Sequence, residues 1–383
     1  MKYIRQPLHA LNDSLPLRGK LILAFVALAL LPIAMIGFYA DFVTHKLIND
    51  AAENDLANSS NQTAQQIDSY ILSQMNSIRT EAQQPFLGDY LELPAAQRKD
   101  SLQELNASQI LVIFSRKDPT FINSYALLDE HGMNLLDTEE RQIGNDESNY
   151  DYFTTAFAQG LPFASTILFQ QDNDFFISAP VRNEKGETIG VLRAEYDAVL
   201  IQSMLLSILS ERDAGDFISV IDRNTYVRLA DTGDSENLYK SLKNLSPAEV
   251  VNLQSQHLLP HGKPEDLLVS SAEMITGMEQ LSQHLFFETY STSIQDNALI
   301  TGVALQYVPW MVLEGRSQAI LSEPIKDQRR TTILMTFLIL FVAVFAALPM
   351  SSMIARPVVN LTSVAKHIAS GDLATVADRR AHV

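Results

Sequence analysis

YALLDEHGMNLLD, residues 125–137, is the stretch of sequence that decides the fold. It holds two apolar runs on either side of Glu130-His131-Gly132, which is hairpin chemistry because glycine supplies the positive φ of the turn. Downstream, residues 175–181 and 188–194 flank a second turn, and a helix-like piece at residues 150–157 lies between the two pairs. The pattern predicts one antiparallel sheet with a helix and loop across one face, a shape suited to a small pocket.

A second sheet module is predicted from residue 217 onward. Its expected strands are residues 217–222, 226–230, 285–290, 299–306 and 310–315. Ser246-Pro247-Ala248-Glu249 predicts a helix start, with serine as the cap, proline at the first position and glutamate closing a capping box. Residues 240–283 are expected to be mostly helical. The fold class is therefore α+β, with two antiparallel sheet units in tandem.

Two apolar blocks lie near the ends of the chain. Leu21 to Ala40 and Thr331 to Ala355 contain no charged residue. Each is about long enough to cross a bilayer as a helix, which takes roughly 20 residues. A cleaved signal peptide is the alternative for the first block, but its apolar core exceeds the usual length of about 7–15 residues and no small-residue cleavage site follows it. We therefore expect two membrane helices, at residues 21–40 and 331–355.

The charge distribution predicts an orientation. The chain has 28 Lys and Arg against 45 Asp and Glu, a net charge of −17, yet both terminal segments are net positive. Positive flanks stay in the cytoplasm, so residues 1–20 are expected to be a cytoplasmic lead and residues 41–330 to lie outside a bacterial inner membrane. The acidic exterior argues against nucleic acid as a partner. The absence of cysteine excludes disulfides and thiolate metal sites.

Residues 41–84 are expected to form a long stalk helix that ends at Pro85. The segment lacks Gly and Pro, and Ile67, Ile71, Met75 and Ile78 recur at helical spacing. This helix could pair with the same helix of a second subunit, or it could pack on its own domain.

The segment after the second apolar block also has a helical pattern. Val358, Leu361, Ala365 and Ile368 are spaced as in a coiled-coil seam, and Gly371 stands where a helix usually stops.

At this point the chain resembles the double Cache sensors of bacterial transmembrane receptors, which carry two PAS-like sheets in tandem. The residues that carry the resemblance are 128–138, 143–148, 152–156 and 178–192, together with 308–314 at the end of the second unit. Arg356-Pro357 with Gly371-Asp372-Leu373 is similar to the first helix of a HAMP signalling module. The order of span, double Cache, span and HAMP is more specific than any single motif.

The resemblance implies the domain boundaries and the function. A membrane-distal Cache unit is expected at residues 85–211, a membrane-proximal unit at 212–325 and a partial HAMP module at 356–383. The distal unit would bind a small molecule, and helix motion within a homodimer would carry the signal through Pro357 and Leu361. We expect a sensory fragment without a catalytic domain, with the output of a sensor histidine kinase. A diguanylate cyclase, a chemotaxis receptor and a non-signalling ectodomain are the alternatives.

The candidate ligand-binding residues are Tyr150, Tyr152, Phe153, Glu195 and Asp197. The amino-acid-binding members of the class have an Arg before the aromatic pair, and that Arg is missing at the matching position of this chain, which disfavours an α-amino acid. Glu195 or Asp197 could hold an ammonium group, and the aromatic rings could add cation–π attraction. Alternatively, the aromatic residues are core and Glu195 is a solvated strand residue.

The other motifs in the sequence do not predict a metal site or a catalytic site. Asp172-Asn173-Asp174 resembles a fragment of a calcium loop but is better interpreted as a polar turn. His257 and His261 have the spacing of metal ligands on a helix, yet Pro260 lies between them and no third ligand is placed. We find no nucleophile–base set and no phosphate-binding loop, and we expect no metal and no cofactor.

Overall fold

The computed structural model describes residues 17–170, 172–212 and 215–369. The chain divides into two units, and each is described by itself: residues 51–321 form one, and residues 1–50 with 322–383 form the other.

The first sheet of the larger unit confirms the two predicted hairpins. Its strands are β1 (Ile122–Asp129), β2 (Asn134–Asp137), β3 (Phe163–Phe169), β4 (Asn173–Arg182) and β5 (Thr188–Asp197). They pair antiparallel in the order β2-β1-β5-β4-β3. Gly132 and Gly186 occupy the two hairpin turns at φ +82°. A Cβ on Gly132 would lie 2.6 Å from the Cα of Ser148, so only glycine fits there.

Helices cover both faces of this sheet. They are α2 (Leu17–Glu81), α3 (Pro85–Leu91), α4 (Ala95–Arg98), α5 (Leu102–Ser115) and α6 (Asp151–Gln159), with the short 3-10 helix η1 at Glu140–Gln142. α4 and α5 are separate helices, because Ser101 accepts a hydrogen bond from the amide of Glu104 and so caps the start of α5. α6 contacts β3, β4 and β5, whereas α5 contacts β1 and β2.

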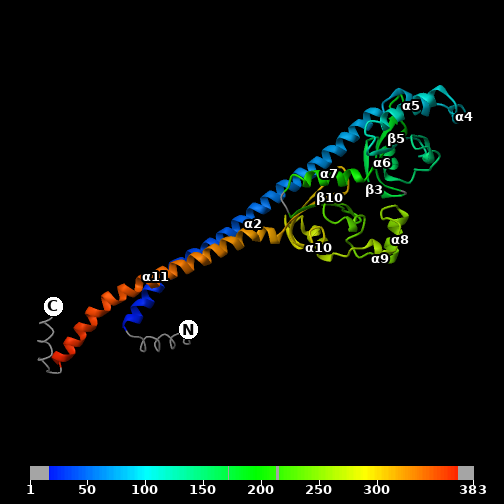
Figure 1. The fold of residues 1–383 in the computed structure, drawn as a ribbon. Helices are drawn as coiled ribbons and strands as arrows, with labels where there is room; N and C mark the ends of the chain where they lie inside the picture. The colour runs from blue at the N-terminus through cyan, green and yellow to red at the C-terminus, as the bar shows by residue number, and fades with distance from the viewer. Residues whose placement is uncertain (1–16, 171, 213–214, 370–383) are drawn as a thin grey trace. The chain divides into compact units, whose positions relative to one another are not determined.

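The second sheet repeats the strand order of the first. Its strands are β6 (Asp216–Asp222), β7 (Arg228–Asp231), β8 (Phe287–Ser291), β9 (Asp296–Ala304) and β10 (Trp310–Ser317), in the order β7-β6-β10-β9-β8. Between β7 and β8 lie η2 (Ser235–Asn237), α8 (Pro247–Ser255), α9 (Pro264–Leu267) and α10 (Ala272–Gln280). The capping box predicted at Ser246 and Glu249 is present at the start of α8. α7 (Val199–Leu209) joins the sheets and contacts β6 and β7 (Figure 1).

The two sheets meet through a buried polar joint. The indole Nε1 of Trp310 donates to Thr166 Oγ1 at 2.9 Å, and the Thr166 hydroxyl donates to Asp222 Oδ2 at 2.6 Å. The ring of Phe175 meets the Trp310 ring edge-on, with 6.0 Å between centroids. The joint therefore links β3 and β4 of the first sheet to β6 and β10 of the second.

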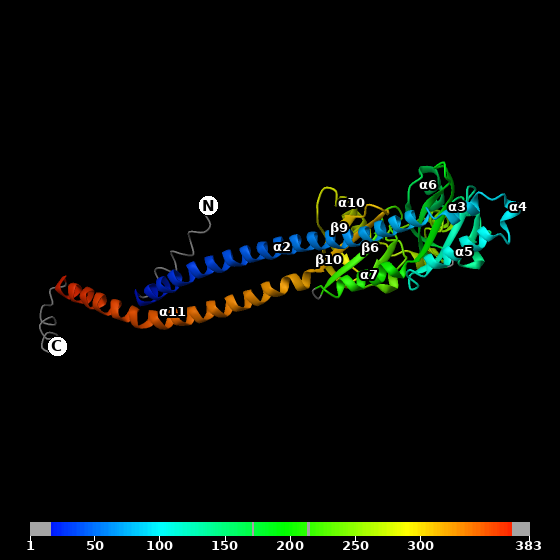
Figure 2. The same cartoon turned by 90° about the horizontal axis from the view of Figure 1, so that it is seen from above.

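Residues 51–81 of α2 run along both sheets (Figures 1 and 2). Near the first sheet, Gln74 accepts a hydrogen bond from the Tyr196 hydroxyl at 3.0 Å, and Glu81 accepts one from Tyr125 at 2.9 Å. Near the second sheet, Ser59 and Thr63 donate to the buried carboxylate of Glu314 on β10. This part of α2 therefore packs on its own domain.

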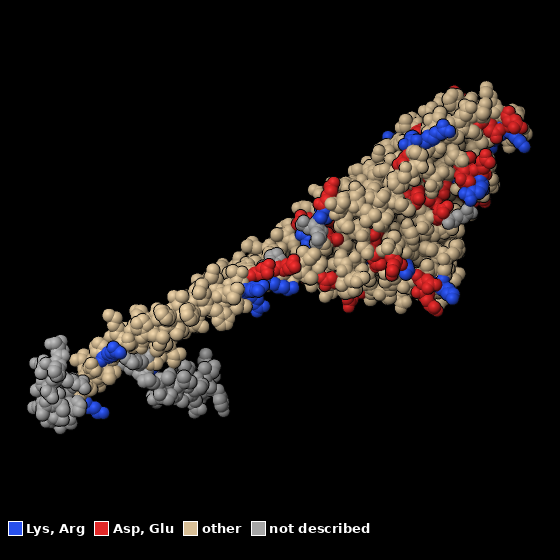
Figure 3. All heavy atoms as spheres, viewed as in Figure 1, with Lys and Arg blue, Asp and Glu red and all other residues tan. Residues whose placement is uncertain are grey.

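The smaller unit consists of the two apolar helical segments. α11 (Gln318–Ala369) and α2 are each long and apolar enough to cross a membrane. In the most apolar 18-residue stretch of each helix, the share of residues that is buried is 6% in α11 and 0% in α2. Such exposed apolar surface is suited to a bilayer. The face drawn in Figure 3 has few charged side chains over these segments, while acidic side chains are spread over the sheet-bearing unit. A Cβ on Gly37 would lie 3.3 Å from Thr332 Cγ2, so the two helices approach closely there.

The helix boundaries differ from the expected ones. α2 is continuous through the expected span and stalk, and α11 is continuous through the second span and the HAMP-like segment, so Pro357 and Leu361 lie within it. No glycine or proline stands between residues 38 and 84 to interrupt α2. The expected helix stop at Gly371 and most of the cytoplasmic lead lie outside the described residues.

Candidate functional site

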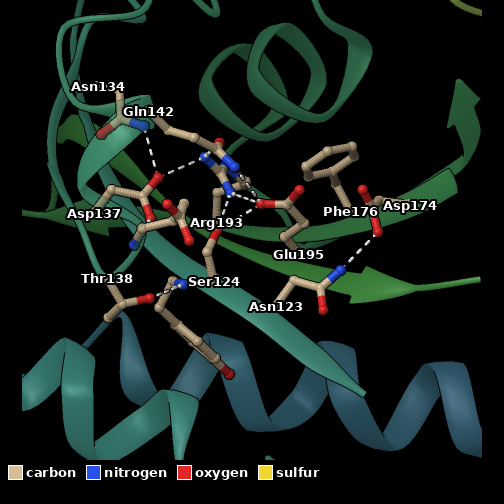
Figure 4. Close-up of polar contacts among 12 residues, drawn as sticks. Asn123, Ser124, Asn134, Asp137, Thr138, Gln142, Asp174, Phe176, Arg193 and Glu195 are labelled. Atoms are coloured by element: carbon tan, nitrogen blue, oxygen red, sulfur yellow. Dashed lines mark hydrogen bonds and ion pairs between the residues drawn. The ribbon is translucent and has the colours of Figure 1, made fainter. Parts of the chain in front are cut away.

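A fully buried arginine lies at the centre of the first sheet, on the face that α6 covers. Arg193 on β5 is 0% exposed and forms ion pairs with Asp137 at 2.9 Å and Glu195 at 3.0 Å (Figure 4). It forms a third ion pair with Glu147 at 3.0 Å. Burying a charge is costly unless it is paired and hydrogen-bonded. Three carboxylates against one guanidinium more than compensate the arginine, and the cluster as a whole carries excess negative charge.

Every nitrogen of the Arg193 guanidinium has an acceptor. Nη1 donates to Ser124 Oγ at 2.8 Å as well as to Glu195, and Nη2 donates to the Gln142 side-chain oxygen at 2.8 Å as well as to the carboxylates. Nε donates to Glu147 Oε2 at 3.1 Å. Arg193 therefore has no free pair of N–H groups to donate to a ligand carboxylate unless one of these partners is displaced.

Strand register explains how the cluster forms. Val191, Arg193 and Glu195 alternate along β5 and so point to one face of the sheet. Ser124 of β1 is the register partner of Glu195, which places its hydroxyl beside the guanidinium. Asp137 ends β2 at the same edge. Glu147 comes from the loop before α6, which the hairpin turn at Gly132 holds because the Glu147 amide donates to the Gly132 carbonyl at 2.8 Å.

Aromatic rings line the cluster on the α6 side. The Arg193 guanidinium lies 5.4 Å from the centroid of the Phe176 ring, a cation–π contact. Tyr152 stacks on Phe176 at 4.6 Å and on Tyr150 at 5.2 Å, and its hydroxyl donates to Glu147 Oε2 at 2.9 Å. These rings and Phe153 belong to the apolar cluster between α6 and the sheet.

An open cavity of about 550 Å³ lies beside the Arg193 cluster. Its lining includes Ser124, Gln142 and Glu195 of the cluster, together with Glu139, Asp172 and Asp197. Arg141 also lines it, but this side chain is 75% exposed and pairs with Glu139 at 2.7 Å. The cavity is large enough for a small molecule and its walls carry more carboxylates than cations.

Burial, together with the surrounding negative charge, raises the pKa of a neighbouring carboxyl. The pKa of Asp174 on β4 is raised to about 8, first because of burial and then because Glu195, Asp172 and Asp197 are close. Hydrogen bonding to Glu195 also raises it, and Asn123 Nδ2 donates to Asp174 Oδ1 at 2.8 Å. At neutral pH the Asp174 carboxyl is therefore mostly protonated.

The residues predicted from sequence fall into two groups. Glu195 and Asp197 line the cavity, while Tyr152 and Phe153 are buried in the apolar cluster and Tyr150 caps the start of α6. Glu195 is 7% exposed, so it is not a solvated strand residue. The Asp197 carboxylate accepts a hydrogen bond from the Val199 amide at 2.8 Å, at the entry to α7. Whether these five residues bind a ligand stays a prediction.

Glu195 was identified from the sequence, whereas Arg193, Asp137 and Glu147 were not. An arginine is indeed absent at the start of α6, but one enters the site from β5. A signal for it was present, since residues 189–194 are an apolar strand broken only by Arg193. A charge within a strand buried on both faces requires partners of opposite charge, and the acidic loop before α6 offers them.

Solved structures with the same fold are sensor domains of bacterial receptors. The sensor domain of the Vibrio cholerae histidine kinase DctB is similar at a TM-score of 0.56 and 16% identity, over 70% of this chain and 98% of that one. The sensory domain of the Campylobacter jejuni chemoreceptor Tlp3 has a TM-score of 0.49 and 12% identity, over 73% and 99% of the two chains. The ligand-binding domain of the Pseudomonas aeruginosa amino acid chemoreceptor PctC, in complex with GABA, has a TM-score of 0.43 and 17% identity, over 69% and 99%.

The likeness to the DctB sensor domain shows the fold of this chain, which is a double Cache arrangement of two five-stranded sheets with a long N-terminal helix. No protein-family model matches the sequence, and no curated protein matches it either.

Proposed function

We propose that this chain is the sensory part of a transmembrane receptor whose first sheet binds a small cation from outside the cell. The observation that carries the proposal is the acidic cavity beside Arg193, because it lies in a sensor fold and on the sheet face that a helix and a loop cover. The solved sensor domains of the same fold support the assignment to signal reception.

The two apolar helices support a place in the bacterial inner membrane, with residues 41–330 outside and both termini inside. In this arrangement the distal unit is residues 85–211, the proximal unit is residues 212–325, and residues 356–383 begin a HAMP module. The receptor acts as a homodimer, and Pro357 and Leu361 lie on the transmission helix. A ligand must prefer one arrangement of that dimer over the other, because otherwise it shifts no equilibrium.

Electrostatics favour a cationic ligand over a carboxylate. A ligand carboxylate in the cavity would face Glu139, Asp172, Glu195 and Asp197, while Arg193 is already occupied. An ammonium group would instead pair with the Glu195 carboxylate in the cavity wall, and its positive charge would favour loss of the proton from neighbouring Asp174. Tyr150, Tyr152 and Phe153 belong to the aromatic cluster between α6 and the sheet, and we keep them as candidate binding residues.

Titration calorimetry of the full chain in lipid nanodiscs tests the ligand class. Putrescine, ethanolamine and choline serve as cationic probes, with acetate and succinate as anionic probes. We expect at least one cation to bind and neither anion to bind. The Glu195→Gln variant is expected to weaken cation binding by about tenfold, the effect of losing roughly 1.4 kcal/mol of ion-pair attraction.

Glu140→Gln is the matched control, because Glu140 is exposed on η1 and is not part of the cavity lining. It should bind the cation as the natural protein does. Binding of succinate without any binding of a cation would contradict the proposed pocket chemistry.

The affinity for the cation is expected to rise with pH. Asp174 must lose its proton when an ammonium group binds, and its pKa in the free protein is about 8. Affinity should therefore increase by up to tenfold per pH unit below pH 8 and level off above it. The Asp174→Asn variant should show weaker binding without this slope. Calorimetric titrations between pH 6 and 9 measure both, and a slope that persists in Asp174→Asn would assign the titration to another group.

The same carboxyl has an effect on stability. Asp174 binds more protons in the folded state than in the unfolded chain at pH values between 3.8 and about 8. The free energy of unfolding of the ligand-free protein therefore decreases as pH rises through that window, because the folded state is stabilised by the proton on Asp174.

The described residues of this chain do not specify the output of the whole receptor. We propose a sensor histidine kinase of a two-component system, with a diguanylate cyclase or a chemotaxis receptor as the alternatives. The sequence encoded after residue 383 distinguishes them: a phospho-accepting histidine on a dimerising helix, a nucleotide-binding α/β domain, or a very long coiled coil.

A further inference from the structure

A second cavity, of about 450 Å³, lies in the membrane-proximal unit, on the second sheet. Its walls come from the β6–β7 turn, from α10 and from strands β9 and β10. The side chains that give it its character are Arg223, Tyr226, Met278, Glu279, Leu281 and Met311. No residue of this cavity belongs to the acidic cavity of the first sheet.

The two cavities differ in charge. The second one carries one cation, Arg223, and one anion, Glu279, on different elements. The Glu279 carboxylate accepts a hydrogen bond from the Tyr226 hydroxyl at 3.2 Å. Among the described residues, the Arg223 guanidinium has no ion pair or side-chain hydrogen bond. A free guanidinium is a natural partner for a carboxylate, which the first cavity would repel.

The rest of the wall is apolar. Met278 is buried, Leu281 and Met311 are half-buried, and the two methionines supply flexible, polarizable surface. Gly302 forms part of the floor, where a Cβ would lie 2.7 Å from Leu281 Cδ1. An apolar group of a ligand can therefore pack on this part of the wall.

The backbone at Tyr226 is strained. Its φ is +57°, a left-handed conformation that a bulky side chain rarely adopts. The turn is held by Asp222, whose side-chain Oδ1 accepts from the amides of Asn224 at 2.8 Å and Thr225 at 2.9 Å. Strain of this kind costs of order 1–3 kcal/mol and persists where the surroundings impose it. Here it places the Tyr226 ring in the cavity wall and its hydroxyl on Glu279.

The position of the cavity connects it to the second apolar helix. Met311 lies on β10, and α11 begins at Gln318, directly after β10 ends at Ser317. A ligand that contacts Met311 therefore touches the strand that continues into α11.

We propose that this cavity is a second ligand site, specific for a small zwitterion with an apolar body. The ligand carboxylate pairs with Arg223, its ammonium group pairs with Glu279, and its apolar part packs on Met278, Leu281 and Met311. The site is independent of the cation site in the first sheet, so the failure of either one leaves the other standing.

The test is titration calorimetry of the full chain in nanodiscs with a panel of zwitterions, namely the apolar protein amino acids and 4-aminobutanoate. At least one is expected to bind. Two molecules match leucine but lack one charged group each: isoamylamine lacks the carboxylate, and 4-methylpentanoate lacks the ammonium group. Each half-molecule should bind at least tenfold more weakly than the zwitterion, because one charged residue of the site is left unpaired.

Two variants on separate elements test the assignment. Arg223→Met and Glu279→Gln should each weaken the zwitterion at least tenfold, whereas Arg116→Met, an exposed arginine outside both cavities, and Glu195→Gln should leave it unchanged. An amine that binds only in the first cavity keeps its affinity in Arg223→Met. The proposal is overturned if no zwitterion of the panel binds, if Arg223→Met binds it normally, or if Glu195→Gln abolishes its binding.

Discussion

Replacing Arg193 with methionine is expected to destabilise the folded protein by about 3–5 kcal/mol, the usual cost of removing one partner from a buried ion pair. The guanidinium is 0% exposed and is the positive partner of Asp137, Glu147 and Glu195. Without it, three carboxylates remain in a site that excludes water. Thermal unfolding in nanodiscs, followed by circular dichroism in the presence and absence of denaturant, measures the loss.

The matched control is Arg141→Met, at the rim of the adjacent cavity. Its side chain is 75% exposed and its pair with Glu139 is a surface ion pair, so its loss should leave the melting temperature nearly unchanged. Lower pH should reduce the deficit of Arg193→Met, because burial raises the pKa of Asp137 and protonation of this carboxyl removes part of the uncompensated charge. Equal melting temperatures for Arg193→Met and the natural protein would show that the cluster contributes nothing to stability.

The elements that depend on neighbouring residues could be predicted from the sequence. The turn at Gly132 and the capping box at Ser246 and Glu249 are encoded within a few positions, and the structure contains both. The repetition of strand pairs likewise indicated two sheets in tandem. Local chemistry was sufficient for these features because their hydrogen bonds join residues that are close along the chain.

β3 was not predicted, and the reason is the pattern of its residues. Residues 163–169 form a short run that is buried on both faces, so the alternation that identifies a half-buried strand is missing. The strand begins soon after Gly160, which ends α6 at φ +64°. A periodicity of two cannot be seen in such a run.

The candidate site depends on contacts between distant residues, and for that reason only part of it was predicted. Glu195 and Asp197 were identified through the resemblance, which implies an acidic residue near the end of the last strand of the distal unit. Their relation to Asp137 and Glu147 depends on the order of strands in the sheet, in which β1 lies between β2 and β5. Nothing in the spacing of these residues specifies that order.

The second large effect is expected at the joint between the sheets. Trp310→Ala should destabilise the protein by about 3–5 kcal/mol, as large-to-small changes of a buried tryptophan do. Trp310 is 0% exposed, packs edge-on against Phe175, and donates to Thr166. The loss removes the largest side chain between the sheets and leaves a cavity that neither sheet can fill alone.

The change should also separate the unfolding of the two sheets. In the natural protein Thr166 of β3 is hydrogen-bonded to both Trp310 and Asp222 of the second sheet, so we expect one cooperative transition for residues 51–321. In Trp310→Ala, differential scanning calorimetry should resolve two transitions. Cation binding at the first sheet should then raise the melting temperature of one transition only, because the ligand stabilises just the sheet that it contacts.

Two controls make the result specific. Trp310→Phe keeps most of the buried ring and loses the indole hydrogen bond, so its cost should be about 1 kcal/mol. Tyr290→Ala removes an aromatic side chain from β8 of the same sheet, where it is 51% exposed, and should change stability by less than about 0.5 kcal/mol. A single transition in Trp310→Ala, shifted as a whole by ligand, would show that the contacts of α2 and α7 alone hold the two sheets together. Signals would then pass from the first sheet to β10 along those helices rather than through the joint.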